Sequence, residues 1–506
     1  MTEKDVNSTI SSPTFDAPAF QYITVFQTVL MTRSPLSIGA NETDPVSDQP
    51  VLRDSKGIPF IPGTSIAGVL RSYLETWFLA KYGAVEKPTP VDRLFGSTEK
   101  NCGQSMLIFD DLYPMGPVRT NVRDMVRISP GTGRTEVHGK FDREVLLPGE
   151  LFPIRFELRT IQKISELETE VRKTLAALFD LFNGKNGKCQ FSLGSRTSRG
   201  LGRIGMAPGF AGWNVEEYFI ADPGGLKKWI LHGANQINKS SKITGCDQLI
   251  GEWLKIQNMY RMDVKGLHLE LKLKIRDGLI VRGPGRKGYT DDNKPSDSAQ
   301  FREQLQDGSD YLLIPGTSVT GVIRHRARMI ANTVYRSEGA DYSEQLISMI
   351  FGTGPLCAKP RAGCFKIDEA IIDNPVELRH TRVAIDPWTG GALDHCLFTE
   401  DVIYDGTIRL NLSLSVKEKS KEHDFPAMAG LLMLVLRDLW EGDLPVGGEA
   451  SVGRGVLEGM EGILVAEDKE ENLVFKNGML VSGGSMIPGW VDTFVNWQPI
   501  REGDTK

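Results

Sequence analysis

The residues best suited to chemistry gather in one short loop, Gly194–Arg203. The loop holds three arginines, two serines, a threonine and three glycines, and it contains no acidic residue. Glycine lets a backbone approach a ligand closely, hydroxyls donate hydrogen bonds, and arginine binds phosphate through two parallel hydrogen bonds. These groups are suited to gripping a phosphodiester backbone, and the alternative is a tight solvated turn. The candidate binding residues of this loop are Arg196, Ser198, Arg199, Gly200 and Arg203.

The same loop recurs later in the chain with weaker chemistry. Gly447–Gly455 keeps glycines at its ends but carries Glu449 and a single arginine, so its attraction for an anion is poorer. Its candidate binding residues are Ser451, Gly453 and Arg454.

A second basic element shows the opposite asymmetry. Ile61–Arg71 recurs as Ile314–Arg324, and both copies begin with Ile-Pro-Gly-Thr-Ser. The first copy ends in an arginine followed by Glu75, whereas the second continues with two more arginines. Each half therefore has one basic element. If the two elements face the same groove, they could bind one continuous strand of nucleic acid. The candidate binding residues are Ser65, Gly68, Arg71, Ser318, Gly321, Arg324, Arg326 and Arg328.

Carboxylates gather in a polar segment ahead of each copy of this second motif. Gly39–Asp54 contains four acidic residues, and the later segment, 282–298, contains Asp291, Asp292 and Asp297. Carboxylates in a loop beside a basic surface are suited to holding a hydrated magnesium ion, or to positioning a water or hydroxyl for phosphodiester cleavage. A solvated acidic loop explains the same residues equally well. The sequence has no GxxxxGK[ST], GxSxG or HExxH motif, which argues against several common enzyme classes.

The motifs recur in the same order, which indicates a duplicated unit, and such self-similarity is the strongest guide to the fold. Each half is predicted to run strand, helix, strand, strand, helix, strand, with insertions after the first strand and between the second and third. This is the order of a ferredoxin-like or RRM-like unit. We therefore predict an α+β fold of two tandem units, with a Thr or Ser of the Pro-Gly-Thr-Ser motif capping the first helix of each. The expected first-half strands are 22–31, 107–112, 151–158 and 189–193, and the expected second helix spans 167–182.

Composition sets the class of protein. The chain has 506 residues, of which 40% are hydrophobic and 25% charged, as in a soluble globular protein of two or three domains. The formal net charge of −6 means that any nucleic acid must be bound through local patches. No segment approaches eighteen uninterrupted apolar residues, so we expect a cytoplasmic protein that has no contact with a membrane. The expected divisions are a first domain at 15–210, a connecting segment at 211–265, a second domain at 266–460 and an extension at 461–506.

Taken together and in this order, the motifs resemble those of the RAMP superfamily backbone subunits of type III CRISPR effector complexes. The resemblance rests on Ile61–Arg71, Ile314–Arg324, Ile385–Phe398 and Gly194–Arg203, and it covers nearly all of both halves. Two complete units in one chain are similar to the double-RAMP fusion subunits of type III-D-like systems. The resemblance implies an RRM-derived palm that grips a guide crRNA and a thumb hairpin that interrupts the guide–target duplex. The implied partners are target RNA, other RAMP-family and small subunits, and the large subunit of the complex.

The resemblance also implies a loop aspartate that cuts target RNA with a divalent cation, Mg²⁺ or another. Asp48 matches its place, just before a Pro-Val-hydrophobic-Arg-Asp stretch. The second half lacks that stretch, and Asp292 is its candidate. No metal ligand is singled out. The thumb is expected to include 134–144 in the first half and 389–401 in the second.

The leading hypothesis is a backbone subunit that binds guide RNA and cleaves target RNA at the first repeat. One alternative is a backbone subunit that is purely structural. Another is a nuclease that processes precursor guide RNA, although such relatives often use a histidine base and the first histidine here, His138, lies outside the opening strand and helix. A two-domain metabolic enzyme is the remote alternative.

Overall fold

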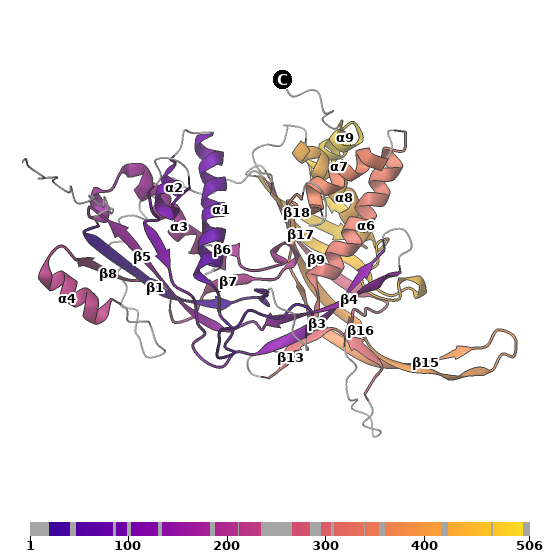
Figure 1. The fold of residues 1–506 in the computed structure, drawn as a ribbon. Coiled ribbons are helices and arrows are strands. Elements are labelled where there is room, and N and C mark those ends of the chain that lie inside the picture. Colours follow the sequence, from indigo (N-terminus) through magenta and orange to yellow (C-terminus); the bar gives the residue numbers. More distant parts are fainter. Residues whose placement is uncertain are drawn as a thin grey trace, which may run out of the picture.

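The computed structural model places most of the chain in two α+β halves, coloured indigo to magenta and salmon to yellow in Figure 1. The described residues are 20–40, 47–83, 88–98, 103–129, 134–182, 188–210, 212–233, 266–283, 295–304, 308–337, 340–353, 360–415, 424–466 and 469–498. Within them, no helix is long and apolar enough to cross a membrane.

The first half is built on one antiparallel sheet. Its strands are β1 (Tyr22–Thr32), β2 (Leu107–Phe109), β5 (Leu151–Thr160), β6 (Lys188–Ser192), β7 (Arg203–Met206) and β8 (Asn214–Phe219). The order β2-β5-β1-β7-β6, with β8 also paired to β1, places the opening strand in the centre. This is the strand order of a ferredoxin-like unit.

Helices cover one face of this sheet (Figure 1). They are α1 (Gly63–Tyr82), α2 (Pro90–Phe95) and α3 (Thr169–Phe182). Apolar residues three or four apart place one face of each helix on the sheet. Leu70, Leu74 and Leu178 are accordingly fully buried, and the Phe179 ring lies 5.0 Å from that of Phe26 on β1.

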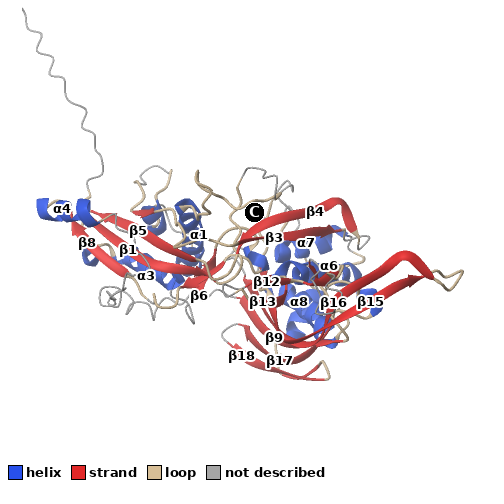
Figure 2. Ribbon diagram, turned by 90° about the horizontal axis from the view of Figure 1, so that it is seen from below, coloured by secondary structure: helices blue, strands red, loops and turns tan. Residues whose placement is uncertain are grey.

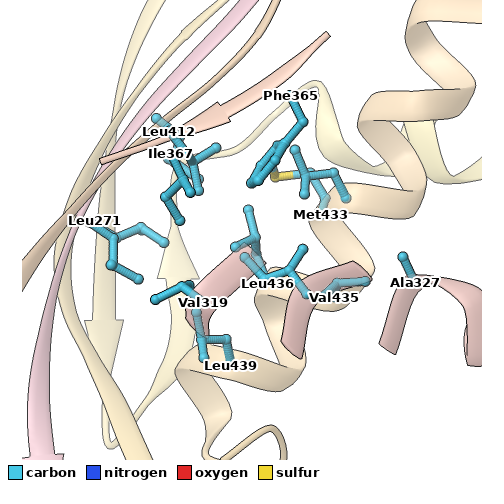
Figure 3. Close-up of a cluster of buried hydrophobic side chains, with 14 of the residues drawn as sticks. Leu271, Val319, Ala327, Phe365, Ile367, Leu412, Met433, Val435, Leu436 and Leu439 are labelled. Carbon is cyan, nitrogen blue, oxygen red and sulfur yellow. The ribbon is translucent and has the colours of Figure 1, made fainter. Parts of the chain in front are cut away.

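The second half repeats the plan. Its core strands are β9 (Gly266–Arg276), β14 (Phe365–Ile367), β16 (Ala392–Ser415) and β17 (Val456–Ala466), and its helices are α6 (Gly316–Val334), α7 (Ala340–Phe351) and α8 (Asp424–Glu441). β14 pairs with β16, β16 with β9 and β9 with β17, all antiparallel, which reproduces the order of the first half. Figure 3 shows Leu271 and Leu412 of this sheet facing Val319 of α6 and Leu436 of α8. The prediction of two similar α+β units is confirmed.

Each half carries a long hairpin between its second and third core strands. The first is β3 (Thr120–Ile128) with β4 (Thr135–Leu146), and the second is β15 (Ala370–Ile385) with β16. The β15–β16 hairpin projects away from the body in both views, whereas β3–β4 lies against the second half (Figures 1 and 2). The expected thumb segments lie in these two hairpins.

The remaining elements extend the two sheets. The shorter ones are β10 (Arg282–Gly283), β11 (Ser298–Gln300), β12 (Arg302–Gln304), β13 (Asp310–Ile314), β18 (Lys469–Lys476), β19 (Met479–Ser482), α4 (Pro223–His232), α9 (Ile487–Val495) and the 3-10 turns η1 (Ile164–Glu166), η3 (Thr197–Arg199) and η5 (Ala450–Val452). β8 and α4 lie in the expected connecting segment. β8 extends the first sheet by pairing with β1, and α4 packs on β8 through Trp229 and Tyr218. β18 and β19 extend the second sheet, and Trp490, Phe494 and Trp497 of the expected extension are buried in its core.

Two local predictions were wrong. The helices α1 and α6 begin directly after Pro62 and Pro315, and no side chain caps either of them. A Cβ at Gly63 would lie 2.4 Å from the carbonyl oxygen of Phe109, so the motif needs glycine to let the helix start close to a strand. The second strand is also shorter than expected, ending at Phe109.

A buried ion-pair network joins the two halves. Arg123, on β3, is 3% exposed and donates to Glu303 at 2.6 Å and to Glu369 at 2.5 and 3.2 Å. Its guanidinium also lies 5.3 Å from the centre of the Phe301 ring. Burial opposes the charge of Arg123, but the two carboxylates raise its pKa overall. The base of the first hairpin is therefore fastened to the second half.

Candidate nucleic-acid interface

The two glycine-rich loops adopt the same backbone conformation. Gly194–Arg203 and Gly447–Gly455 each contain one 3-10 turn, η3 and η5 respectively. Arg196 and Glu449 precede these turns in the left-handed region, with φ of 55° and 61°. The loops therefore differ in side-chain chemistry while sharing their geometry.

Four arginines come together around the first loop and across to the second half: Arg143 of β4, Arg196 and Arg199 of the loop, and Arg324 of α6. We call them the arginine cluster. Burial, and then repulsion by Arg196 and Arg324, lower the pKa of Arg199 to about 10. Burial and its neighbours Arg143 and Arg127 lower the pKa of Arg196. No carboxylate among the described residues forms an ion pair with a member of the cluster. The carboxylate of Glu344 acts on Arg324, but burial and the charge of Arg328 outweigh it and lower the pKa of Arg324 overall. Adjacent cations that form no ion pair create a local potential that attracts a polyanion.

Arg143 was missed by sequence reasoning, which assigned it to the hairpin alone. It is 7% exposed, and its Nη1 donates to Ser37 Oγ at 3.1 Å and to Ser195 Oγ. Strand pairing brings it to the loop, because Leu36 pairs with Leu146 of the hairpin and the neighbouring Ser37 carbonyl accepts from the Ser195 nitrogen of the loop. The available sequence signal is a charged residue just ahead of the apolar run Val145–Leu147.

The repeated motif at the start of α1 and α6 differs in charge between the halves: its arginine is neutralised in the first half and forms no ion pair in the described second half. Arg71 donates to Glu75 at 2.7 Å and to Asp92 at 3.1 Å, so its charge is balanced. Its counterpart Arg324 donates only to the carbonyl oxygen of Gly352 among the described residues, at 3.3 Å. Of these two equivalent arginines, only Arg324 is without an ion pair in the described residues.

Three further candidate arginines are occupied by carboxylates. Arg203 pairs with Asp368 across the junction of the halves, Arg326 with Asp438 of α8, and Arg328 with Glu344 of α7. These contacts tie elements together, so the three side chains contribute less to an open positive surface than the arginine cluster does.

Arg454 does not face solvent. It is 5% exposed and donates to Glu400 at 2.9 Å, and it lies 2.6 Å from Glu449. Its position matches Leu201 of the first loop and not one of that loop's arginines. Arg454 is therefore a buried structural residue, and the expectation that it contacts a ligand directly does not agree with its burial.

The candidate glycines divide into two kinds. Gly68 and Gly321 are exposed at equivalent places on α1 and α6, and a Cβ at either would meet nothing within 4 Å. Gly453 is open in the same way. Gly200 differs, because a Cβ there would lie 2.6 Å from the backbone nitrogen of Glu369, so this glycine serves the contact between the halves. The candidate serines are half-buried at Ser65, Ser198 and Ser318 and exposed at Ser451.

Asp48 is exposed and is held against the first hairpin. Its backbone nitrogen donates to Asp142 Oδ1 at 2.7 Å, and the backbone nitrogen of Asp142 donates to Asp48 Oδ2 at 3.0 Å. Each of the two carboxylates thus accepts a hydrogen bond from the backbone nitrogen of the other residue. Nearby, Glu144 accepts from the Val51 nitrogen and from Arg53, which fixes the segment that follows Asp48.

The structural counterpart of Asp48 is Asp297. Its carboxylate accepts from the Thr399 nitrogen at 2.7 Å, and its own nitrogen donates to the Thr399 carbonyl at 3.0 Å. Asp297 follows a serine as Asp48 does, and an arginine and an acidic residue stand at the same distance after it. Asp292, the sequence candidate, lies outside the described residues.

The two aspartate sites differ in their capacity for a metal ion. Asp142 supplies a second carboxylate beside Asp48, whereas Thr399 stands beside Asp297. Mg²⁺ is commonly held by one or two carboxylates together with waters and substrate phosphates. No group of three or more metal-ligating side chains occurs in the described part of the chain. The donor set at Asp48 and Asp142 fits a hydrated magnesium ion completed by a substrate, and it does not fit a fully protein-held ion.

Two tandem ferredoxin-like units, with a cluster of arginines that form no ion pair in the described residues, are the kind of fold and surface that suits an extended polyanion. The profile of the RAMP superfamily matches residues 29–205 and 269–458, one match in each half. The chain therefore belongs to the RAMP superfamily, whose members are CRISPR-associated proteins that bind crRNA. No curated protein matches it.

Proposed function

We propose that the chain is a backbone subunit of a type III CRISPR effector complex in which both halves hold one guide RNA. The observation that carries this proposal is the arginine cluster. It joins the loop of the first half to α6 of the second, and its charges repel one another in the absence of an anion. A phosphodiester backbone that runs along it would relieve that repulsion.

The exposed glycines Gly68 and Gly321 on α1 and α6 also support RNA binding across both halves. A glycine inside a helix costs about 0.5–1 kcal/mol relative to alanine. Packing within the described chain does not explain Gly68 or Gly321, because nothing lies near their missing Cβ atoms. Close approach of an external backbone to these two helices would explain both, and both motifs begin at the same kind of helix start.

We further propose that Asp48, with Asp142, supports cleavage of target RNA. A magnesium ion bound there would activate water or a hydroxyl and neutralise charge on the phosphate. The chain's own contribution is to hold the Asp48 carboxylate at the base of the hairpin through the backbone of Asp142. Target choice would come from pairing with the guide, because the candidate contacts are directed at the backbone.

The alternative is a structural backbone subunit without catalytic activity. It is favoured by the hydrogen bonds that tie the carboxylates of Asp48 and Asp142 to backbone nitrogens, as expected of residues that fasten a loop to a hairpin. The assembled complex, incubated with RNA complementary to its guide with and without magnesium, separates the two. Magnesium-dependent cuts within the paired region support cleavage, and an intact target under both conditions supports the structural role.

A further inference from the structure

One hairpin position carries opposite charges in the two halves. In the first half, the hairpin residue that approaches the loop is Arg143, and in the second half it is Glu400. The correspondence follows from pairing: Leu36 bridges to Leu146, three residues after Arg143, as Leu279 bridges to Ile403, three residues after Glu400. A buried cation in one unit is thus replaced by a buried anion in the other.

The surrounding groups change with it. A Cβ at Gly194 would lie 2.3 Å from the carbonyl oxygen of Ser37, and one at Gly447 would lie 2.5 Å from that of Ile280, so these residues correspond. The hydroxyl of Ser37 is therefore lost at Ile280. The equivalent loop positions replace Ser195 by Gly448 and Arg196 by Glu449. All four groups that suit an anion in the first half are absent from the second.

In the second half, internal carboxylates already balance the arginines. Glu400 accepts from Arg382 and Arg454, and Arg282 lies 3.3 Å from it. Glu449 contacts the same three arginines. Burial alone would raise the pKa of Glu400, but hydrogen bonds from the arginines lower it to about 2, so it is charged at neutral pH. Three cations share two anions.

In the first half the matching cation has no carboxylate partner among the residues that the structure describes. Arg143 donates through Nη1 to the two serine hydroxyls, and its Nε, also buried, has no hydrogen-bond partner among the described residues. A buried guanidinium that lacks a carboxylate is costly unless an external anion completes it. Arg196 faces the same place, since Arg143 is among the charges that lower its pKa and its guanidinium lies over the Phe141 ring.

We propose that Arg143, Ser195 and Arg196 form a site for one phosphate group, and that Glu400 and Glu449 fill the equivalent place in the second half. The phosphate would be a phosphodiester of bound RNA or free inorganic phosphate, and this choice rests on the proposed function. The two loops therefore do not bind a ligand in the same way. The first holds a phosphate, and the second is closed by its own carboxylates.

The test compares the full chain, freed of RNA, in inorganic phosphate and in chloride at equal ionic strength. Because a ligand that binds only the folded state raises Tm, phosphate is expected to raise Tm for the wild type. Arg143→Gln is expected to lose that shift. If this buried variant does not fold, Ser195→Ala with Arg196→Gln, on the loop, carries the same expectation. An equal Tm in both salts, or a shift that these variants retain, overturns the site.

The RNA arm separates this proposal from the proposed function. Binding of a short single-stranded RNA is measured against salt concentration, and the removal of one phosphate contact lowers the slope by about 0.7. Arg143→Gln should lower it, and Glu449→Arg, which copies Arg196 on a matching backbone, should raise it. If phosphate raises Tm but the chain binds no RNA, the phosphate site stands and the proposed RNA-binding function is rejected. If RNA binding is unchanged by both substitutions, the proposed function stands and the phosphate site is rejected.

Discussion

At the scale of single residues, what matters is which charges are already balanced. Arg71, Arg203 and Arg454 have carboxylate partners, whereas Arg143 and Arg199 form no ion pair within the described part of the chain. Composition revealed the arginines, but several of their partners, such as Asp368 for Arg203, stand far away in the sequence. Glu400 lies 54 residues from Arg454 and reaches it only through the hairpin. Sequence reasoning therefore identified a basic loop, and it could not separate the arginines that form ion pairs from those that do not.

The first prediction concerns Asp48. Asp48→Ala is expected to abolish one cut in the target RNA while guide retention and target affinity stay unchanged. Loss of a group that positions a metal ion, water or a 2′-hydroxyl typically lowers a rate about 10²–10⁴-fold. Cleavage products of the assembled complex are measured on a labelled target in magnesium.

The matched control is Asp297→Ala, at the equivalent place without a second carboxylate. It should leave that cut intact. Full-rate cutting at every site in Asp48→Ala, together with the disappearance of a cut in Asp297→Ala, would place the nuclease in the second half. If neither substitution changes the products, the structural role is correct.

At the scale of elements, apolar periodicity predicted the helices and strands well. The alignment of the two insertions with each other could not be predicted. The helix expected at 167–182 and the strand expected at 151–158 are found as α3 and β5 to within two residues, because the buried face of each leaves a periodic apolar pattern in the sequence. The counterpart of Asp48 was not found, because the insertions have different lengths in the two halves. Only the pairing of Asp297 with Thr399 on the hairpin restores the register.

A second prediction belongs to the helices. Gly321→Leu on α6 is expected to weaken guide retention without loss of stability, since a Cβ at this exposed position meets nothing within 4 Å and the substitution removes a helix glycine. The free energy of unfolding should stay the same or rise by about 0.5–1 kcal/mol. Guide retention and denaturant unfolding are measured in parallel.

Asn332→Leu serves as its control, because it is exposed about three turns further along the same helix. Guide retention should be unchanged in this variant. Equal retention in Gly321→Leu and the wild type would show that no RNA approaches α6 at that point.

At the scale of the whole molecule, the network at Arg123 determines how the halves are held together. The repeat in the sequence predicted two similar units but carried no information on their contact. That contact depends on a hairpin residue of one unit meeting Glu303 and Glu369 of the other. Because the arginine cluster also spans both halves, the binding surface requires this fixed arrangement.

The third prediction tests that arrangement. Arg123→Ala leaves two buried carboxylates without their partner and is expected to cost about 3–5 kcal/mol in the free energy of unfolding. Denaturant unfolding of the full chain measures it. Arg127→Ala is the control: Arg127 lies on the same strand, is largely exposed and is 3.7 Å from Glu136, so its loss should cost less than about 1 kcal/mol. A similar small cost for both substitutions would mean that the junction is not held by this network.

The central claim, that the arginine cluster holds the guide, is tested most directly by RNA retention across a salt series. The complex is expressed with its operon, and the wild type is compared with Arg196→Ala and Arg199→Ala together. We predict that a short RNA copurifies with the wild type, and that the double variant loses it at lower salt, because phosphate contacts release counterions. Retention that is unchanged at every salt concentration would contradict the account.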